Sequence, residues 1–200
     1  TGLKYIFEKV DFDYVIPMDG DGEDRPEEIK EFIYQIKKSN SKPIVGERIK
    51  RSESLLFQVC YKMHKLITFT FTGNIIKFGN FTCLPKKTVE KMINEKATWN
   101  SFSGALTKVE KDLISIPSIR GSRYFGPSKM SFYNLIKHSL SIISVFRKAF
   151  LIRSALFIVL YILLIKTNAS VITAIPLILL LIAVYSISNL ALRENMDEFE

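Results

Sequence analysis

The hydrophobic positions of this chain are unevenly distributed, and its last quarter is the most apolar part. Residues 169–192 carry no charge, and a helix of that length, rising about 1.5 Å per residue, exceeds the roughly 30 Å hydrocarbon core of a bilayer. A second apolar run covers residues 149–165 and is interrupted near its start by Arg153, whose long side chain can reach the lipid headgroups. Because residues 166–168 alone separate the two runs, the pattern predicts two membrane-spanning helices in a tight hairpin.

In the preceding part, short apolar runs alternate with amphipathic stretches, and this alternation predicts an α/β domain. Residues 13–18 have the composition of a buried parallel strand that ends in acids. A helix start should follow, because Asp24 and Glu27 have the spacing of a capping box and Pro26 suits the first turn. Residues 42–48 predict the next strand, so the order strand, helix, strand predicts half of a doubly wound sheet. The apolar stripe of the intervening helix is Ile29, Phe32, Ile33 and Ile36.

Later segments extend this pattern towards the hairpin. Residues 52–71 predict a long amphipathic helix, which either packs on the core or lies in the membrane interface, since the same apolar face serves both. Residues 78–84 predict a loop entering a strand, residues 86–93 a short helix, and residues 115–118 an edge strand. We expect residues 131–148 to form an amphipathic helix at the membrane interface.

The net charge of +8 is unevenly placed as well. Residues 120–153 contain seven Arg or Lys and no Asp or Glu, which suits anionic lipid headgroups or a lipid phosphate. Nucleic acid is the other common partner of a basic patch, but the adjoining apolar segments argue against it. Basic residues precede the first predicted span, whereas the connecting loop holds only Lys166, so the positive-inside rule places both termini in the cytoplasm. In that compartment we expect Cys60 and Cys83 to be packing thiols.

Two acids stand one residue apart at the end of the first predicted strand. Asp19 and Asp21 could form only a solvated turn, which is the more common role of such a pair. Their place between a strand end and a helix start favours another interpretation, in which their oxygens hold Mg or Mn and leave other positions for substrate phosphates. Such a cation would neutralise the diphosphate leaving group of a nucleotide-sugar.

A second polar segment, residues 123–129, joins two fixed cations and a hydroxyl through a flexible glycine. Arg123, Ser128 and Lys129 could fold over phosphates, because charged and hydroxyl donors form strong hydrogen bonds to phosphate oxygens. The alternative is an exposed basic turn without a ligand.

Four short sequence segments resemble motifs of the inverting family 2 glycosyltransferases, particularly the polyprenyl-phosphate and dolichyl-phosphate sugar transferases. The segments follow one another along the chain in the same order as in that family. Residues 18–27 resemble the signature Met-Asp-Ala-Asp-Leu-Gln-Asp-Pro-Pro-Glu, and residues 45–48 resemble a Tyr-Gly-x-Arg strand. Residues 79–81 resemble a Gly-Asp-Phe loop, and residues 123–129 resemble an Arg-x-x-Gly-x-Ser-Lys loop. The resemblance covers roughly residues 10–190, the predicted hairpin included.

The resemblance implies a GT-A-like, Rossmann-like domain for nucleotide-sugar transfer over residues 1–130, and we expect the N-terminal part of that domain to be missing. The interfacial helix at 131–148 follows, then the spans at 149–165 and 169–192. Residues 193–200 would form an acidic cytoplasmic tail.

The reaction implied by the resemblance is attack of a lipid phosphate on the anomeric carbon of a nucleotide-sugar, with inversion. Asp19, Asp21 and Asp24 would bind the donor and its metal, with Asp21 and Asp19 as the direct ligands. Asp24 could instead only cap the helix. Asp21 and Asn80 would be the catalytic residues. The residues that bind phosphate would be Arg48, Arg123, Ser128 and Lys129.

One position departs from the family pattern. Asn80 stands where many relatives carry Asp, and an amide cannot accept a proton as a carboxylate does. A phosphate nucleophile is already ionised near neutral pH, so Asn80 could orient it instead.

Three functions remain open on these grounds. The first is sugar transfer to a polyprenyl phosphate for the cell envelope, and the second is transfer to another lipid or to a polysaccharide. The third is a catalytically degenerate relative that only binds or assembles in the membrane. Richness in Lys, Ile, Asn and Phe points to an AT-rich bacterial genome, hence to the bacterial inner (plasma) membrane, where a homo-oligomer would also be compatible with the sequence.

Overall fold

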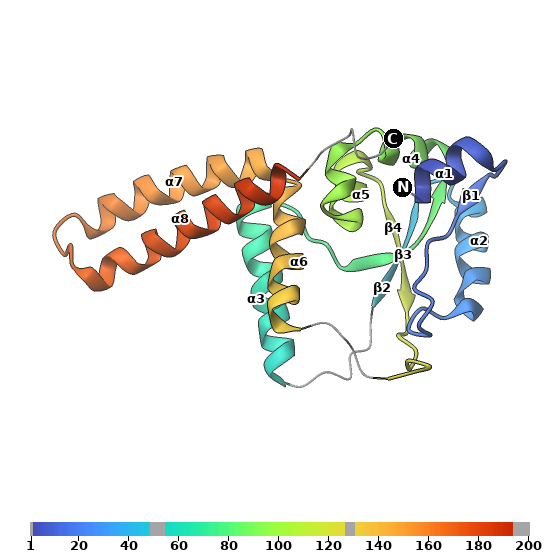
Figure 1. The fold of residues 1–200 in the computed structure, drawn as a ribbon, viewed down its shortest axis with the longest axis horizontal. Coiled ribbons are helices and arrows are strands. Elements are labelled where there is room, and N and C mark those ends of the chain that lie inside the picture. Colours follow the sequence, from blue (N-terminus) through green and yellow to red (C-terminus); the bar gives the residue numbers. More distant parts are fainter. Residues whose placement is uncertain (1, 49–54, 127–130, 194–200) are drawn as a thin grey trace.

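The computed structural model describes residues 2–48, 55–126 and 131–193, and consists of a mixed α/β domain followed by a hairpin of two long helices (Figure 1). The first elements, with 3-10 helices marked η, are α1 (Gly2–Lys9), β1 (Tyr14–Val15), η1 (Pro26–Glu28), α2 (Ile29–Lys38), β2 (Ile44–Arg48) and α3 (Leu55–Thr72). The remaining elements are β3 (Phe78–Pro85), α4 (Lys86–Ile93), η2 (Lys96–Trp99), α5 (Phe102–Val109), β4 (Ile114–Ser118), α6 (Phe132–Ser144), α7 (Arg147–Ile165) and α8 (Val171–Ala191).

The strands of the described residues form one mixed sheet in the order β1-β3-β2-β4. Strand β3 is antiparallel to both of its neighbours, whereas β2 and β4 are parallel to each other. Strands β1, β2 and β4 therefore run in one direction, and their carboxyl ends lie at the same edge of the sheet. Loops at this edge are the usual ligand-binding positions of such sheets.

The first strand differs from its prediction. The sequence predicts a buried parallel strand over residues 13–18, but β1 covers only Tyr14–Val15, is half-buried and pairs antiparallel with the end of β3. Pro17 has no N–H to donate to a ladder, which limits the length of the strand. Strand β3 also lies between β1 and β2, so the expectation that these two strands form half of a doubly wound sheet is wrong in this detail.

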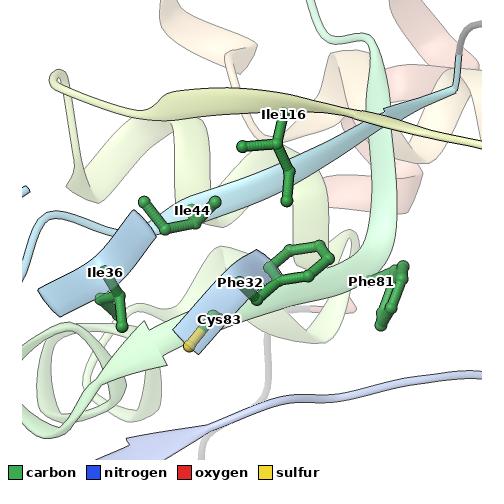
Figure 2. Close-up of a cluster of buried hydrophobic side chains, with 6 residues drawn as sticks. All are labelled: Phe32, Ile36, Ile44, Phe81, Cys83 and Ile116. Atoms are coloured by element: carbon green, nitrogen blue, oxygen red, sulfur yellow. The ribbon is translucent and has the colours of Figure 1, made fainter. Parts of the chain in front are cut away.

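Side chains that alternate along the strands build a core on each face of the sheet. Neighbouring residues such as Ile44 and Val45 belong to different cores, and a fully buried side chain of this size stabilises the fold by about 1.5–3 kcal/mol. The cluster that includes α2, shown in Figure 2, consists of Phe32, Ile36, Ile44, Phe81, Cys83 and Ile116. The cluster that includes α4 and α5 consists of Val45, Leu84, Val89, Met92, Ala105 and Leu106.

The helix start before α2 is only partly as predicted. Pro26 is the first residue of η1, in agreement with the sequence. The predicted capping box is wrong, because the N-cap position falls on Arg25, whose side chain makes no capping bond. The carboxylate of Asp24 instead accepts a hydrogen bond from the backbone N–H of Asp19. Asp24 thus stabilises the loop that precedes the helix.

Most of the other predicted elements are confirmed, but the helix predicted over residues 131–148 ends at Ser144, and residues 147–148 already belong to α7. Helix α2 buries Phe32 and Ile36 of its apolar stripe, β2 lies within residues 42–48, and α4 coincides with residues 86–93. Strand β4 is the edge strand expected at residues 115–118. Residues 78–84 belong to strand β3 from the first residue, whereas the sequence predicts a loop before the strand. Helix α3 confirms the helix predicted over residues 52–71, although residues 52–54 lie outside the described part of the chain.

Helices α7 and α8 are long and apolar enough to cross a membrane, and they pack against each other as the predicted hairpin. In Figure 1 the hairpin projects from the sheet domain, while α3 and α6 lie side by side across its base. A hydrogen bond joins α7 to α8 near the turn of the hairpin, where the Tyr161 hydroxyl donates to the carbonyl oxygen of Thr173 at 3.1 Å. At the base of the hairpin, α6, α7 and α8 pack together through a buried hydrophobic cluster of Ile143, Phe150, Leu180 and Ile187.

Candidate functional site

Two polar loops meet at the sheet edge where β1, β2 and β4 end. The acidic loop, residues 19–24, follows β1, and the arginine loop, residues 119–126, follows β4. Their backbones are joined directly, since the N–H of Gly121 donates to the carbonyl of Glu23 at 2.8 Å and the N–H of Tyr124 donates to the carbonyl of Asp21 at 2.9 Å. The fold therefore brings together two segments that lie about a hundred residues apart in the chain.

Glycines permit this close approach. Gly22 has a φ of +91°, a conformation that favours glycine, and the ring of Tyr124 would lie 2.8 Å from a Cβ at this position. A Cβ on Gly121 would lie 2.3 Å from the carbonyl oxygen of Gly22. Because this oxygen belongs to the backbone, it cannot move away by a change of side-chain rotamer. The contact between the loops thus depends on the absence of a side chain at both positions.

Asp21 links the two loops through its carboxylate. Its Oδ1 accepts a hydrogen bond of 3.0 Å from the backbone N–H of Glu23, and its Oδ2 lies 3.3 Å from Nη2 of Arg123. The side chain is partly exposed, at 36%. The fold therefore brings Asp21 and Arg123 together, and the carboxylate stays accessible from outside.

Asp24 is the buried member of the acidic loop, with a side chain that is 4% exposed. Its Oδ2 accepts a hydrogen bond of 2.8 Å from the N–H of Asp19, and its Oδ1 lies 3.7 Å from Nη2 of Arg48. Burial raises the pKa of Asp24, and the negative charges of Asp19 and Asp21 raise it further, against the lowering effects of the Asp19 N–H and Arg48. The three acids are therefore close enough for their charges to interact.

Arg48 connects the acidic loop to the segment that resembles the Gly-Asp-Phe loop. A Cβ on Gly79 would lie 3.5 Å from Nη2 of Arg48, the same atom that faces Asp24. Arg48 stands at the end of β2, where parallel pairing with Ser118 brings it level with the end of β4. Strands β1, β2 and β4 thus each end beside the residues of this candidate site.

Asn80 lies in an irregularity of the sheet. Between the pairs Val45 with Thr82 and Glu47 with Phe78, strand β2 has one residue and β3 has three, residues 79–81. Such bulges redirect side chains and are frequent beside functional sites. Within the described residues, the side chain of Asn80 makes no hydrogen bond with the acids, and its backbone carbonyl accepts one of 3.2 Å from the Thr82 hydroxyl. The structure therefore places Asn80 on an exposed bulge and assigns it no partner among the acids.

Ser128 and Lys129, which the sequence predicts to bind phosphate, lie outside the described residues. Two residues that the sequence does not predict as part of the site are Glu23 and Arg120. Glu23 accepts a hydrogen bond of 2.9 Å from Nε of Arg123, and it also pairs with Arg120. The three-residue interval between the two arginines was visible in the sequence, but no local signal pointed to the acid that lies opposite them.

Among the described residues, no group of three or more His, Cys, Asp or Glu side chains is arranged to hold a metal ion. A hard divalent cation such as Mg²⁺ is commonly bound by one or two carboxylates together with substrate phosphates. Asp19 and Asp21 supply carboxylate oxygens of that kind, and their negative charges raise the pKa of Asp24. In the chemistry of their donors, these two acids fit a cation that arrives with a phosphate ligand.

Comparison of the chain with protein-family models, with curated proteins and with solved structures found no match. The fold defines a mixed α/β protein with two apolar helices that could span a membrane. A proposal of function therefore depends on the contacts of the two loops and on the motif resemblance of the sequence.

Proposed function

We propose that this chain is a membrane-bound glycosyltransferase that moves a sugar from a nucleotide-sugar to a polyprenyl phosphate with inversion at the anomeric carbon. The observation that carries the proposal is the contact of 3.3 Å between Asp21 and Arg123. It joins a carboxylate suited to a cation and a guanidinium suited to phosphate at one edge of the sheet. A nucleotide-sugar donor, with its diphosphate and its cation, needs both groups in one place.

In this proposal Asp19 and Asp21 hold Mg or Mn, which when bound neutralises the charge of the diphosphate leaving group. Arg123 and Arg48 bind phosphate oxygens, because guanidinium groups form bidentate hydrogen bonds with them. Asp24 supports the acidic loop through its bond with the N–H of Asp19. A phosphate oxygen of the acceptor forms the new bond to the anomeric carbon, and the nucleoside diphosphate departs with the electrons of the broken bond.

The helices around the hairpin support a location at the membrane surface. Helix α3 packs on α6 and α7, and its residues Met63, Leu66 and Phe69 are exposed by 57%, 65% and 49%. Apolar side chains exposed beside two candidate spans suit the headgroup boundary, so of the two alternatives for α3 we favour the interfacial one. The proposal places the sheet domain and both ends of the hairpin on the cytoplasmic side of a bacterial inner membrane.

One observation favours a second candidate function, a catalytically degenerate relative that only binds or assembles in the membrane. Asn80 stands on an exposed bulge, and within the described residues its side chain forms no hydrogen bond with the acids. A protein of this kind would retain the contact between the loops without turnover. Transfer to another lipid or to a polysaccharide is the remaining alternative among enzymes.

The test uses membranes that contain the full-length protein, a panel of radiolabelled nucleotide-sugars and a lipid extract. Thin-layer chromatography should reveal a charged lipid monophosphate-sugar, and Asp21→Asn should abolish it. A labelled polysaccharide or neutral lipid would contradict the proposed acceptor. No labelled product with any donor, from protein that is shown to be folded, would favour the degenerate relative.

A further inference from the structure

We propose that Glu23 is a positioning residue, which holds the arginine loop in the geometry that binds phosphate. The proposal rests on the proposed function and adds to it a residue that would not touch the substrate. The Glu23 side chain is only 12% exposed. One oxygen, Oε1, accepts a hydrogen bond of 2.9 Å from Nε of Arg123, and the other, Oε2, pairs with Nη2 of Arg120.

The backbone of Glu23 adds a third bond to the same loop. Its carbonyl oxygen accepts a hydrogen bond of 2.8 Å from the N–H of Gly121. A single residue of the acidic loop thus binds Arg120, Gly121 and Arg123. The start of the arginine loop has a separate anchor, since Oε1 of Glu28 accepts a hydrogen bond of 2.9 Å from the N–H of Ile119. Loss of the Glu23 side chain would therefore loosen the loop beyond its first residue without releasing it altogether.

Glu23 also makes the two arginines compatible with each other. The pKa of Arg120 is lowered by burial and by the nearby charge of Arg123, so the two cations oppose each other. A carboxylate that binds both compensates this repulsion. Without it, we expect the two guanidinium groups to separate, and the positive charge offered to a phosphate would be dispersed.

Arg123 contacts two acids, Asp21 and Glu23, which have different roles in this proposal. Its Nη2 lies 3.3 Å from Oδ2 of Asp21, whereas its Nε donates to Glu23 at 2.9 Å. When Asp21 engages a cation, the bond to Glu23 can remain and keep Arg123 beside the bound diphosphate. In the absence of Glu23, Asp21 becomes the remaining acidic partner of Arg123 among the described residues, and the guanidinium then competes with the cation for Asp21.

The test compares the full-length wild-type protein with Glu23→Ala, Glu23→Gln and the control Glu31→Ala. Glu31 is an acid on α2 whose side chain accepts a hydrogen bond from Gln35, and among the described residues it forms no hydrogen bond or ion pair with either loop. The first measurement is limited trypsin cleavage after Arg120 and Arg123, read by mass spectrometry. We expect cleavage to be about tenfold faster in Glu23→Ala, intermediate in Glu23→Gln and unchanged in Glu31→Ala, as loss of charge-assisted hydrogen bonds predicts.

The second measurement is the dissociation constant for inorganic pyrophosphate in the presence of Mn²⁺, by titration calorimetry. It should rise about tenfold in Glu23→Ala, rise less in Glu23→Gln, and stay unchanged in Glu31→Ala. Equal affinity and equal cleavage in wild type and both Glu23 variants would overturn the positioning role. Absence of pyrophosphate binding by the wild-type protein would contradict the proposed function instead, and would remove the phosphate role of Glu23 even if cleavage changes as predicted.

Discussion

Arg153, in the first candidate span, donates a hydrogen bond of 2.8 Å from Nη1 to the carbonyl oxygen of Thr70, in the last turn of α3. The same Nη1 lies 3.2 Å from the carbonyl oxygen of Phe69, as a second acceptor. The Phe69 carbonyl also accepts a hydrogen bond of 2.8 Å from the N–H of Gly73. The N–H of Asn74, the usual helical donor to Thr70, instead donates to the Thr72 hydroxyl oxygen, so Arg153 supplies a donor that the end of the helix does not. The sequence predicts only that Arg153 reaches the headgroups, whereas the structure gives it a role in joining the hairpin to α3.

We predict that Arg153→Met destabilises the junction, because it leaves the two carbonyls without this donor while keeping an apolar side chain. The expected loss is about 1.5–3 kcal/mol, the range for hydrogen bonds to charged groups. Thermal unfolding of the full-length protein in detergent measures it, with Lys148→Met as the control, since Lys148 is exposed on the same helix. Equal unfolding temperatures for both variants would contradict the junction role.

Gly121→Ala should separate the two loops without unfolding the sheet. The added Cβ would lie 2.3 Å from the carbonyl oxygen of Gly22, so the loops must move apart. We expect pyrophosphate affinity in the presence of Mn²⁺ to fall about tenfold or more, while the circular dichroism spectrum stays unchanged. Gly20→Ala is the matched control, because a Cβ there meets no atom within 4 Å. Equal losses in both variants would show that the contact at Gly121 is not what matters.

Glu95 makes the stability of the domain sensitive to acid. Burial raises the pKa of Glu95, but hydrogen bonds from Lys108 at 2.8 Å and from the N–H of Ala97 at 3.1 Å lower it, and the net pKa is lowered. A group whose pKa is depressed by folding contributes stability above its unfolded value, about 4.3, and loses it as pH falls through the folded value. Glu95→Gln should therefore be less stable than wild type at neutral pH, and the difference should shrink below about pH 4. A difference that does not change with pH would contradict this origin.

Cys83 should be unreactive in the folded protein. Burial raises the pKa of its thiol to about 12, and its side chain lies in the core beside Phe32 and Ile44. The thiolate is the reactive form, so almost none is present at neutral pH. In a Cys60→Ser background, a maleimide reagent should label Cys83 only after denaturation. Rapid labelling of the native protein would show that this core opens readily.

Much of the fold follows from local patterns in the sequence. The apolar stripe around Phe32 and Ile36 marks α2 because helical periodicity is a local property. The uncharged run at residues 169–192 marks α8, which spans Val171–Ala191, because hydrocarbon thickness sets a minimum length. The order of the strands does not follow in this way. Strand β3 enters between β1 and β2, and such pairing depends on contacts far apart in the chain.

In the candidate site, too, some features follow from local sequence patterns and others only from the fold. Asp21 and Arg123 could be singled out as candidates because each lies in a motif that the sequence shows. Glu23 could not be predicted, because its role depends on two arginines about a hundred residues away that only the fold brings opposite it. The capping role predicted for Asp24 also failed, since a local spacing rule competed with a bond to the N–H of Asp19. The contacts of Glu23 therefore depend on the fold, whereas the bond between Asp24 and Asp19 lies within the loop itself.

The most direct test of the account is the cation dependence of nucleoside diphosphate binding by the full-length protein. Titration calorimetry with a panel of nucleoside diphosphates compares Mg²⁺, Mn²⁺ and EDTA in wild type, Asp21→Asn and the surface control Glu31→Gln. We predict saturable binding that requires the cation, falls about tenfold or more in Asp21→Asn and is unchanged in Glu31→Gln. Binding that survives EDTA, or that is equal in wild type and Asp21→Asn, would contradict the central claim that the acidic loop holds a cation and a diphosphate.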